Sequence, residues 1–141
     1  METGEFKSRI QKHMTWLLTG GKGGERGDFR HANLDGCNLH GHTLEGADFT
    51  GCSLRGAELI RTDLSRAVLK EADLTGAFMH RTQLEAADLT GASLAGAELN
   101  HANLNQAMLT NADLSDADLY EASLDDATLT GARLDNTLGL S

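Results

Sequence analysis

Proline is absent from the 141-residue sequence, aromatic residues make up only 4%, and cysteine occurs twice. So few aromatic residues are unusual for an ordinary globular core. No apolar run approaches the length of a transmembrane helix, and no small-residue cleavage site follows the longest run near the N-terminus, residues 16–18. Two cysteines are too few for a structural zinc site, and we expect neither a disulfide nor a bound metal. These absences predict a cytoplasmic protein without a membrane partner.

Positive charge is also scarce, since the net charge is -9. Residues 1–26 carry +2, which leaves -11 for the rest of the chain. An acidic surface gains no free energy by binding nucleic acid or an anionic membrane, because counterion release and the negative surface potential favour the binding of cationic groups. We therefore expect no direct nucleic-acid contact, and another protein as the partner.

A five-residue period dominates the sequence. From Gly27 to residue 136, 22 consecutive blocks carry Leu, Phe or Met at their central position, and the residue two places earlier is small, with alanine in 16 blocks. An α-helix is excluded, because a five-residue step turns by about 500° and scatters the leucines around the axis. The small residue and the leucine instead face one side of a short extended segment, and the two remaining residues turn the chain. Glycines at the second turn position, such as Gly36, support turns with positive φ.

Correlations at a spacing of 20 residues indicate four blocks in each coil. Phe29 and Phe49 are the only phenylalanines at the central position. His42, Thr62 and Thr82 fall in one column of the small position. We expect His42 to point inward, with Thr62 one coil above it satisfying a ring nitrogen.

Triplets such as Ala-Asp-Leu at 72–74 and Ala-Asn-Leu at 102–104 closely resemble the pentapeptide-repeat family, over about three quarters of the chain. The resemblance implies an all-β fold, a right-handed quadrilateral (four-sided) β-helix solenoid. The 22 blocks would make about 5.5 coils, with Cys37 and Cys52 among the small inward residues. We expect the interior to be full, with no ligand cavity.

Three regions follow from this reading. Residues 1–26 form an N-terminal capping α-helix, at 3–18, and a glycine-rich connector; residues 27–136 form the β-helix, and residues 137–141 a C-terminal tail. The helix is predicted from apolar residues at helical spacing. A membrane-surface or partner-binding helix is the alternative. At the other end, either the tail folds across the last coil or two rods meet as a homodimer through their C-terminal ends.

One side of the predicted rod departs from the rule of small polar outward residues. It carries exposed aromatic residues and arginines, which are enriched at protein interfaces, although a tolerated surface substitution would look the same. The candidate protein-binding residues are Ile60, Arg61, Phe78, His80, Arg81, His101 and Tyr120. His80 and His101 alone are a weak metal signal. We assign no catalytic, cofactor-binding or metal-binding residue, and no cofactor.

A second surface is strongly acidic. One side of the predicted rod is the most acidic and carries Glu45, Asp63, Glu85, Asp125 and Asp126 against Arg66 alone. Residues 113–135 add a dense acidic end, which includes Asp113, Asp116, Asp118 and Glu121. Some pentapeptide-repeat proteins mimic DNA, occupy the duplex-binding saddle of DNA gyrase and protect it from quinolones or other poisons. B-DNA as long as the rod would carry about 15 charges, so a net charge of -11 is of the right order.

The sequence therefore predicts a non-enzymatic protein-interaction scaffold. A DNA-mimicking inhibitor or protector of gyrase or topoisomerase is the alternative, and an enzyme is the less favoured one, since a filled rod has no concave site.

Overall fold

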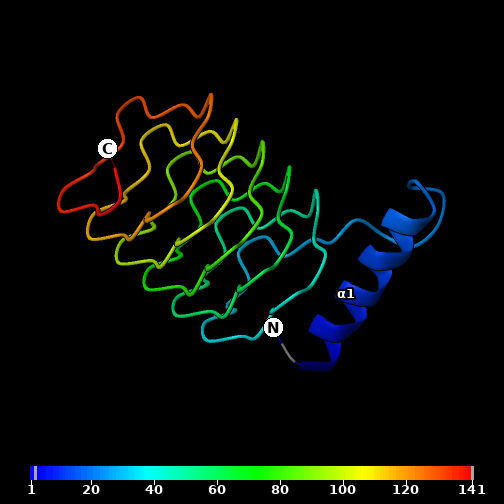
Figure 1. Ribbon diagram of the computed structural model, residues 1–141. Helices are drawn as coiled ribbons and strands as arrows, with labels where there is room; N and C mark the ends of the chain where they lie inside the picture. The colour runs from blue at the N-terminus through cyan, green and yellow to red at the C-terminus, as the bar shows by residue number, and fades with distance from the viewer. Residues whose placement is uncertain (2, 141) are drawn as a thin grey trace.

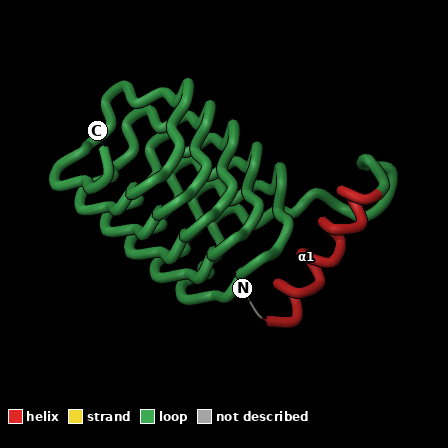
Figure 2. Tube along the Cα trace, in the orientation of Figure 1, coloured by secondary structure: helices red, strands yellow, loops and turns green. Residues whose placement is uncertain are grey.

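The computed structural model describes Met1 and residues 3–140. It consists of one helix, α1 (Thr3–Leu18), and a coil that continues from the connector after α1 to the C-terminal end of the described chain (Figure 1). Helix α1 has the bounds that the apolar spacing predicts. Outside α1, the described residues form turns and single bridging residues but no extended strand (Figure 2). The molecule is a rod with a helix at one end.

Helix α1 ends in a Schellman motif. The Gly21 N–H donates to Trp16 O at 2.8 Å, and the Gly20 N–H donates to Leu17 O at 3.2 Å. Both glycines have positive φ, the conformation that this helix stop requires. In the described part of the chain, no helix is long and apolar enough to span a membrane.

Parallel bridges between residues 20 positions apart hold the coil together. The first joins Asp28 to Asp48, the last joins Asp118 to Leu138, and one bridge occurs at every fifth residue between them. Four five-residue blocks therefore complete one coil, as the correlations in the sequence predict. The last bridge carries the ladder two residues past the end of the 22nd block.

Each side of the coil is short because the chain turns after every three residues. The Leu74 N–H donates to Ser93 O at 2.7 Å in the next coil. The Ala77 N–H donates to Leu74 O at 3.0 Å and closes the corner, where Gly76 has a φ of 65°. We expected extended segments along the sides. A side this short pairs only its middle residue, so isolated bridges occur instead.

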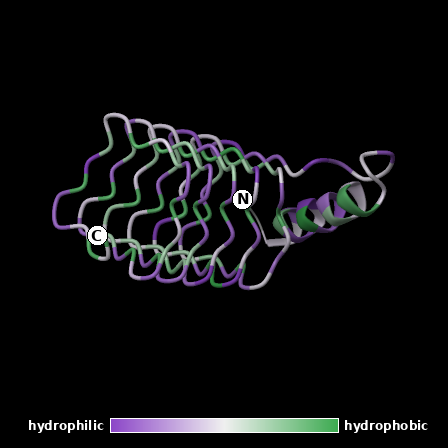
Figure 3. Cartoon of the chain, turned by 45° about the horizontal axis from the view of Figure 1, so that its top comes forward, coloured by the Kyte–Doolittle hydropathy of each residue, from purple (hydrophilic) through white to green (hydrophobic). Residues whose placement is uncertain are grey.

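Leucine and alanine side chains fill the inside of the rod. Leu74, Leu94 and Ala77 are fully buried, with no exposed surface. At the N-terminal end Phe29 stacks on Phe49, with ring centroids 4.8 Å apart. Figure 3 shows the resulting alternation of hydrophobic and hydrophilic residues along the coils.

The prediction that His42 points inward is wrong. His42 is exposed, and its Nδ1 lies 3.3 Å from His40 O. Thr62 is buried as expected, but its hydroxyl donates to Leu39 O at 2.7 Å and is not available to the imidazole. No coil lies beneath the first one, so the His42 ring can remain hydrated and avoids the cost of burial.

Both cysteines occupy the small slot. Cys52 is buried and Cys37 is half-buried, and both are free thiols. Burial raises the pKa of Cys37 to about 11 and that of Cys52 to about 12. The two thiols are therefore neutral and behave as compact hydrophobic groups.

Helix α1 lies across the N-terminal end of the coil. Its Phe6 meets Phe29 edge-on, with ring centroids 5.9 Å apart. His13 is completely buried, and its Nδ1 accepts a hydrogen bond from the Gly27 N–H at 2.8 Å. The helix thus covers apolar residues of the first coil and binds the residue at which the coil begins.

The C-terminal end carries no comparable cover within the described residues. Leu138 continues the ladder and is 62% exposed, and Leu140 is 41% exposed. Residues 137–140 therefore do not fold across the last coil. The core residues of that coil, such as Leu124 and Leu129, are only half-buried.

Candidate protein-interaction surface

The third side of the rod carries the most unusual outward residues, and we call it the Phe78 face. It comprises residues 37–41, 57–61, 77–81, 97–101 and 117–121. Phe78 bridges to Glu58 in the coil before and to Glu98 in the coil after, and its side chain is 40% exposed. Tyr120 is 57% exposed. Our reading of the sequence did not include Glu58 and Glu98, although their spacing of 20 residues from Phe78 places them beside it.

All seven residues of the predicted protein-binding set lie on this face. They are Ile60, Arg61, Phe78, His80, Arg81, His101 and Tyr120. Backbone hydrogen bonds stack them in register, since the Arg61 N–H donates to His80 O at 3.0 Å and the His101 N–H donates to Tyr120 O at 2.9 Å. The face is therefore a grid of neighbouring side chains rather than a set of scattered positions.

The two histidines of the face each contact a glutamate. His80 Nε2 lies 2.9 Å from Glu98 Oε2, and His101 Nδ1 lies 3.1 Å from Glu121 Oε2. The Tyr120 ring meets the His101 ring edge-on, with centroids 6.2 Å apart. Among the described residues, no three His, Cys, Asp or Glu side chains are arranged to hold a metal ion. The histidines thus order the polar groups around the aromatic residues.

Arg61 and Arg81 project from the corner next to the aromatic column. In the part of the chain that the structure describes, neither guanidinium has a carboxylate within 4.0 Å. Both residues adopt a positive φ, 56° and 57°, which glycine tolerates better and which Gly41 has at the equivalent corner of the first coil. Glycine would suit this corner at least as well, so the fold does not require an arginine at either position.

The nine residues of the predicted acidic surface lie on three sides of the rod, and the acidic side has the members that the four-block coil predicts. Because successive blocks occupy successive sides, only five of the nine residues share one side. These are Glu45, Asp63, Glu85, Asp125 and Asp126. Asp113 and Asp116 lie on the second side, and Asp118 and Glu121 lie on the Phe78 face.

Several of these carboxylates also have partners. Glu45 pairs with Arg66 at 2.7 Å, and Asp118 accepts a hydrogen bond from the Asn100 side chain at 2.9 Å. That hydrogen bond lowers the pKa of Asp118 below its ordinary value. The negative charge therefore forms a cluster around the C-terminal coils, with one acidic column extending from it, rather than a continuous stripe.

Comparison with known proteins identifies the repeat. Eight copies of a family model described as pentapeptide repeats match residues 25–51, 52–91, 87–126 and 102–138. The chain belongs to the pentapeptide-repeat family. A search of curated proteins finds no match.

This pentapeptide-repeat protein is similar to several solved structures. Rfr23 from the cyanobacterium Cyanothece 51142 is 29% identical, with a TM-score of 0.77 over 92% of this chain and 98% of that one. HetL from the cyanobacterium Nostoc sp. strain PCC 7120, a protein involved in heterocyst differentiation regulation, is 29% identical, with a TM-score of 0.53 over 79% and 78%. QnrB1, a plasmid-mediated fluoroquinolone resistance protein, is 18% identical, with a TM-score of 0.51 over 84% and 68%. At that identity, the likeness to QnrB1 concerns the fold alone.

Proposed function

We propose that this pentapeptide-repeat protein is a non-enzymatic scaffold with a right-handed, four-sided coil, and that it binds another protein through the Phe78 face. The observation that carries the proposal is the exposure of Phe78 and Tyr120 beside two arginines, Arg61 and Arg81, that lack a carboxylate partner among the described residues. Aromatic residues and arginine supply much of the binding energy of protein interfaces. Packing of the core does not require Phe78, because its position points outward.

The flat, filled walls of the rod support a binding role over a catalytic one. Leucine side chains occupy the interior, so the coil itself encloses no concave site in which water is excluded from a substrate. The free thiols Cys37 and Cys52 support a reducing compartment, and we propose the cytoplasm as the place of action.

The test is a comparison of two surface variants in affinity purification from the source cells. The double substitution Phe78→Ser and Tyr120→Ser should remove a partner that the original protein retains. Met108→Ser is the matched control, because Met108 is 42% exposed in the same outward slot on another side of the rod. A partner retained by the double variant would contradict the proposal and identify Phe78 as a tolerated surface residue.

A second substitution separates binding from stability. Arg81→Gly removes a cation from the Phe78 face and places glycine at a corner with a φ of 57°. We expect the free energy of unfolding to rise by about 0.5–1 kcal/mol, because a strained residue is relieved. Binding of the partner should fall by about 10-fold, measured by calorimetry. Unchanged binding would exclude Arg81 from the interface.

The alternative proposal is a DNA-mimicking inhibitor or protector of gyrase or topoisomerase. It is supported by the net charge of -9 and by the acidic column that includes Asp63 and Glu85. The pairing of Glu45 with Arg66 weakens that column. A gyrase supercoiling assay decides between the two proposals: inhibition of supercoiling, or protection from a quinolone, at a low molar excess would favour the mimic, and neither effect at high excess would remove it.

We further propose that the scaffold forms a homodimer through its open C-terminal end. In earlier coils the central N–H donates to the next coil, whereas those of Leu124, Leu129 and Leu134 have no such acceptor in the described chain. Pairing two such ends would bury Leu138 and satisfy these groups. Acidic residues meet at this junction, so dimerisation should strengthen with salt.

Sedimentation velocity at low and high salt tests the dimer. Leu138→Glu should leave a monomer at concentrations where the original chain dimerises, because the substitution places a charge in the junction. A dimer of unchanged stability in this variant would exclude the C-terminal end as the contact.

A further inference from the structure

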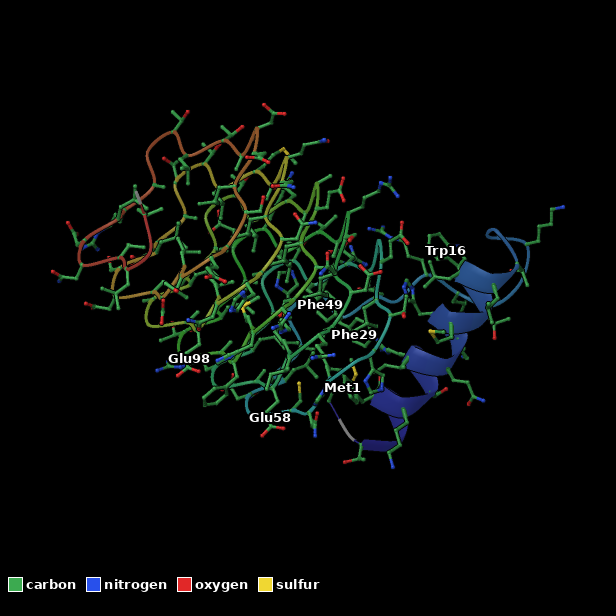
Figure 4. The ribbon with its side chains drawn as sticks, in the orientation of Figure 1. Met1, Trp16, Phe29, Phe49, Glu58 and Glu98 are labelled. Carbon is green, nitrogen blue, oxygen red and sulfur yellow. The ribbon has the colours of Figure 1, made fainter. Side chains whose placement is uncertain are left out.

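We propose that the groove between α1 and the first coil binds a small amphipathic carboxylate, with its apolar chain against Phe6 and Ile10 and its carboxylate at Lys7. The groove has a volume of about 500 Å³. This lies in the range of small-molecule sites in proteins. Figure 4 shows Met1, which also lines the groove, between the start of α1 and the nearest coils. The inside of the rod is filled, and this space lies outside it.

The groove exists because α1 covers only part of the first coil. The contacts of the helix with the coil include those of Phe6 with Phe29 and of His13 with Gly27, at the first block. The third and fourth blocks of that coil have neither a coil beneath them nor complete cover from α1. There, Cys37 is half-buried and His42 is exposed, whereas the residues one coil later in the same two columns, Ala57 and Thr62, are completely buried.

The surface of the groove is mainly apolar, although Thr3, Gln11, Asn33 and Asn38 also line it. Phe6 and Ile10 project from α1, and Leu34 and Cys37 belong to the coil. Burial of such surface favours an apolar ligand by about 25 cal/mol for each Å² removed from water. A sugar or a nucleotide would lose hydration against Phe6, Ile10 and Leu34, so an aliphatic or aromatic body fits this part of the groove better.

The rim of the groove favours a negative headgroup. Lys7 is exposed and has no carboxylate within 4.0 Å in the described part of the chain. Asp35 also lines the groove, but its Oδ1 accepts hydrogen bonds from the Ser53 hydroxyl and from the Arg55 N–H. The Lys7 ammonium therefore provides a positive charge at the rim that suits a carboxylate.

Calorimetry with sodium decanoate, below the concentration at which it forms micelles, tests the proposal. Decanoate should bind saturably at one site for each chain, and uncharged decanol should bind at least about 10-fold more weakly. A 10-fold change corresponds to about 1.4 kcal/mol, a reasonable contribution for one charge-assisted hydrogen bond at a partly exposed site. Absence of saturable binding at about 1 mM decanoate, or equal binding of the two compounds, would overturn the proposal.

Two lysine variants locate the headgroup. Lys7→Glu should weaken decanoate binding by about 10-fold or more, because the substitution reverses the charge at the rim. Lys12→Glu is the matched control, since Lys12 is exposed on the same helix but lies 3.8 Å from Glu25, outside the groove. It should bind decanoate as the original chain does. Equal affinities of the two variants would remove Lys7 from the site.

The reactivity of the Cys37 thiol tests whether the ligand lies against the apolar wall of the groove. In a Cys52→Ala variant, Cys37 is the only cysteine, and alanine is the usual residue of the repeat at position 52. Decanoate at about ten times its dissociation constant should slow modification of Cys37 by N-ethylmaleimide about 10-fold, because the bound ligand covers the thiol. A modification rate that decanoate does not change would place the ligand elsewhere and overturn the proposal.

Discussion

Replacing Leu74 with alanine should lower the free energy of unfolding by about 3–4 kcal/mol. Leu74 is completely buried, and so are Leu54 and Leu94, the leucines one coil before and one coil after it. The substitution removes three carbon atoms, worth about 2.4 kcal/mol in transfer from water. The rest of the loss is the cost of a cavity, because the hydrogen-bonded walls of the rod cannot collapse onto the vacated space.

The matched control is Leu134→Ala in the open last coil. Leu134 has the same position in its block but is 37% exposed, so truncation loses part of the transfer energy and leaves no closed cavity. We expect a loss of about 1 kcal/mol in this variant. The difference between the two losses therefore gives the additional free energy that burial of a leucine contributes in the middle of the rod, compared with its uncovered end.

Urea unfolding followed by far-UV circular dichroism is the assay. With a slope of about 2 kcal/mol per molar urea, Leu74→Ala should lower the midpoint by about 1.5–2 M and Leu134→Ala by about 0.5 M. The single tryptophan, Trp16, lies in α1, and its fluorescence separately reports the release of the helix from the rod. Equal losses of unfolding free energy in the two variants would refute the reasoning, because Leu74 and Leu134 would then not differ in how completely they are buried.

Two further predictions concern titratable groups. Burial is the main reason that the pKa of His13 lies below its ordinary value, with the charge of Arg26 acting in the same direction. Docking of α1 should therefore weaken as the pH falls below about 6.5, because the proton binds the free imidazole more readily than the buried one. The fluorescence emission of Trp16 should change on acidification of the original chain. It should not change in a His13→Gln variant. Because the pKa values of Cys37 and Cys52 are about 11 and about 12, iodoacetamide at about pH 8 should modify the folded chain more than 100-fold more slowly than the urea-unfolded chain. Similar rates for both forms would contradict the burial of the thiols.

The sequence predicts the regular part of the molecule well, because the regular part depends on local rules. The five-residue period places leucine inward in every block, and bridges such as Phe78 to Glu98 follow from four blocks in each coil. The range of α1 follows from apolar spacing and from the glycines after it. The seven residues of the predicted binding set share one face for the same reason, although their binding role is still a proposal.

What the sequence does not predict depends on how the ends are covered. His42 has the sequence position of an inward residue, yet it is exposed because α1 does not reach it. The groove beside Phe6 and Cys37 depends on the angle at which α1 crosses the coil, and no local pattern encodes that angle.

The pairing of each residue with the one 20 positions later restricts which insertions and deletions the chain can accept without altering its surface. Adding one block of five residues between Phe78 and Tyr120 would preserve the core but rotate everything after it by a quarter turn, so that the two aromatic side chains would point to adjacent sides. Adding 20 residues would only move them one coil further apart on the same side. Relatives of different lengths can therefore present the same pattern of outward side chains only where their lengths differ, within that segment, by whole coils.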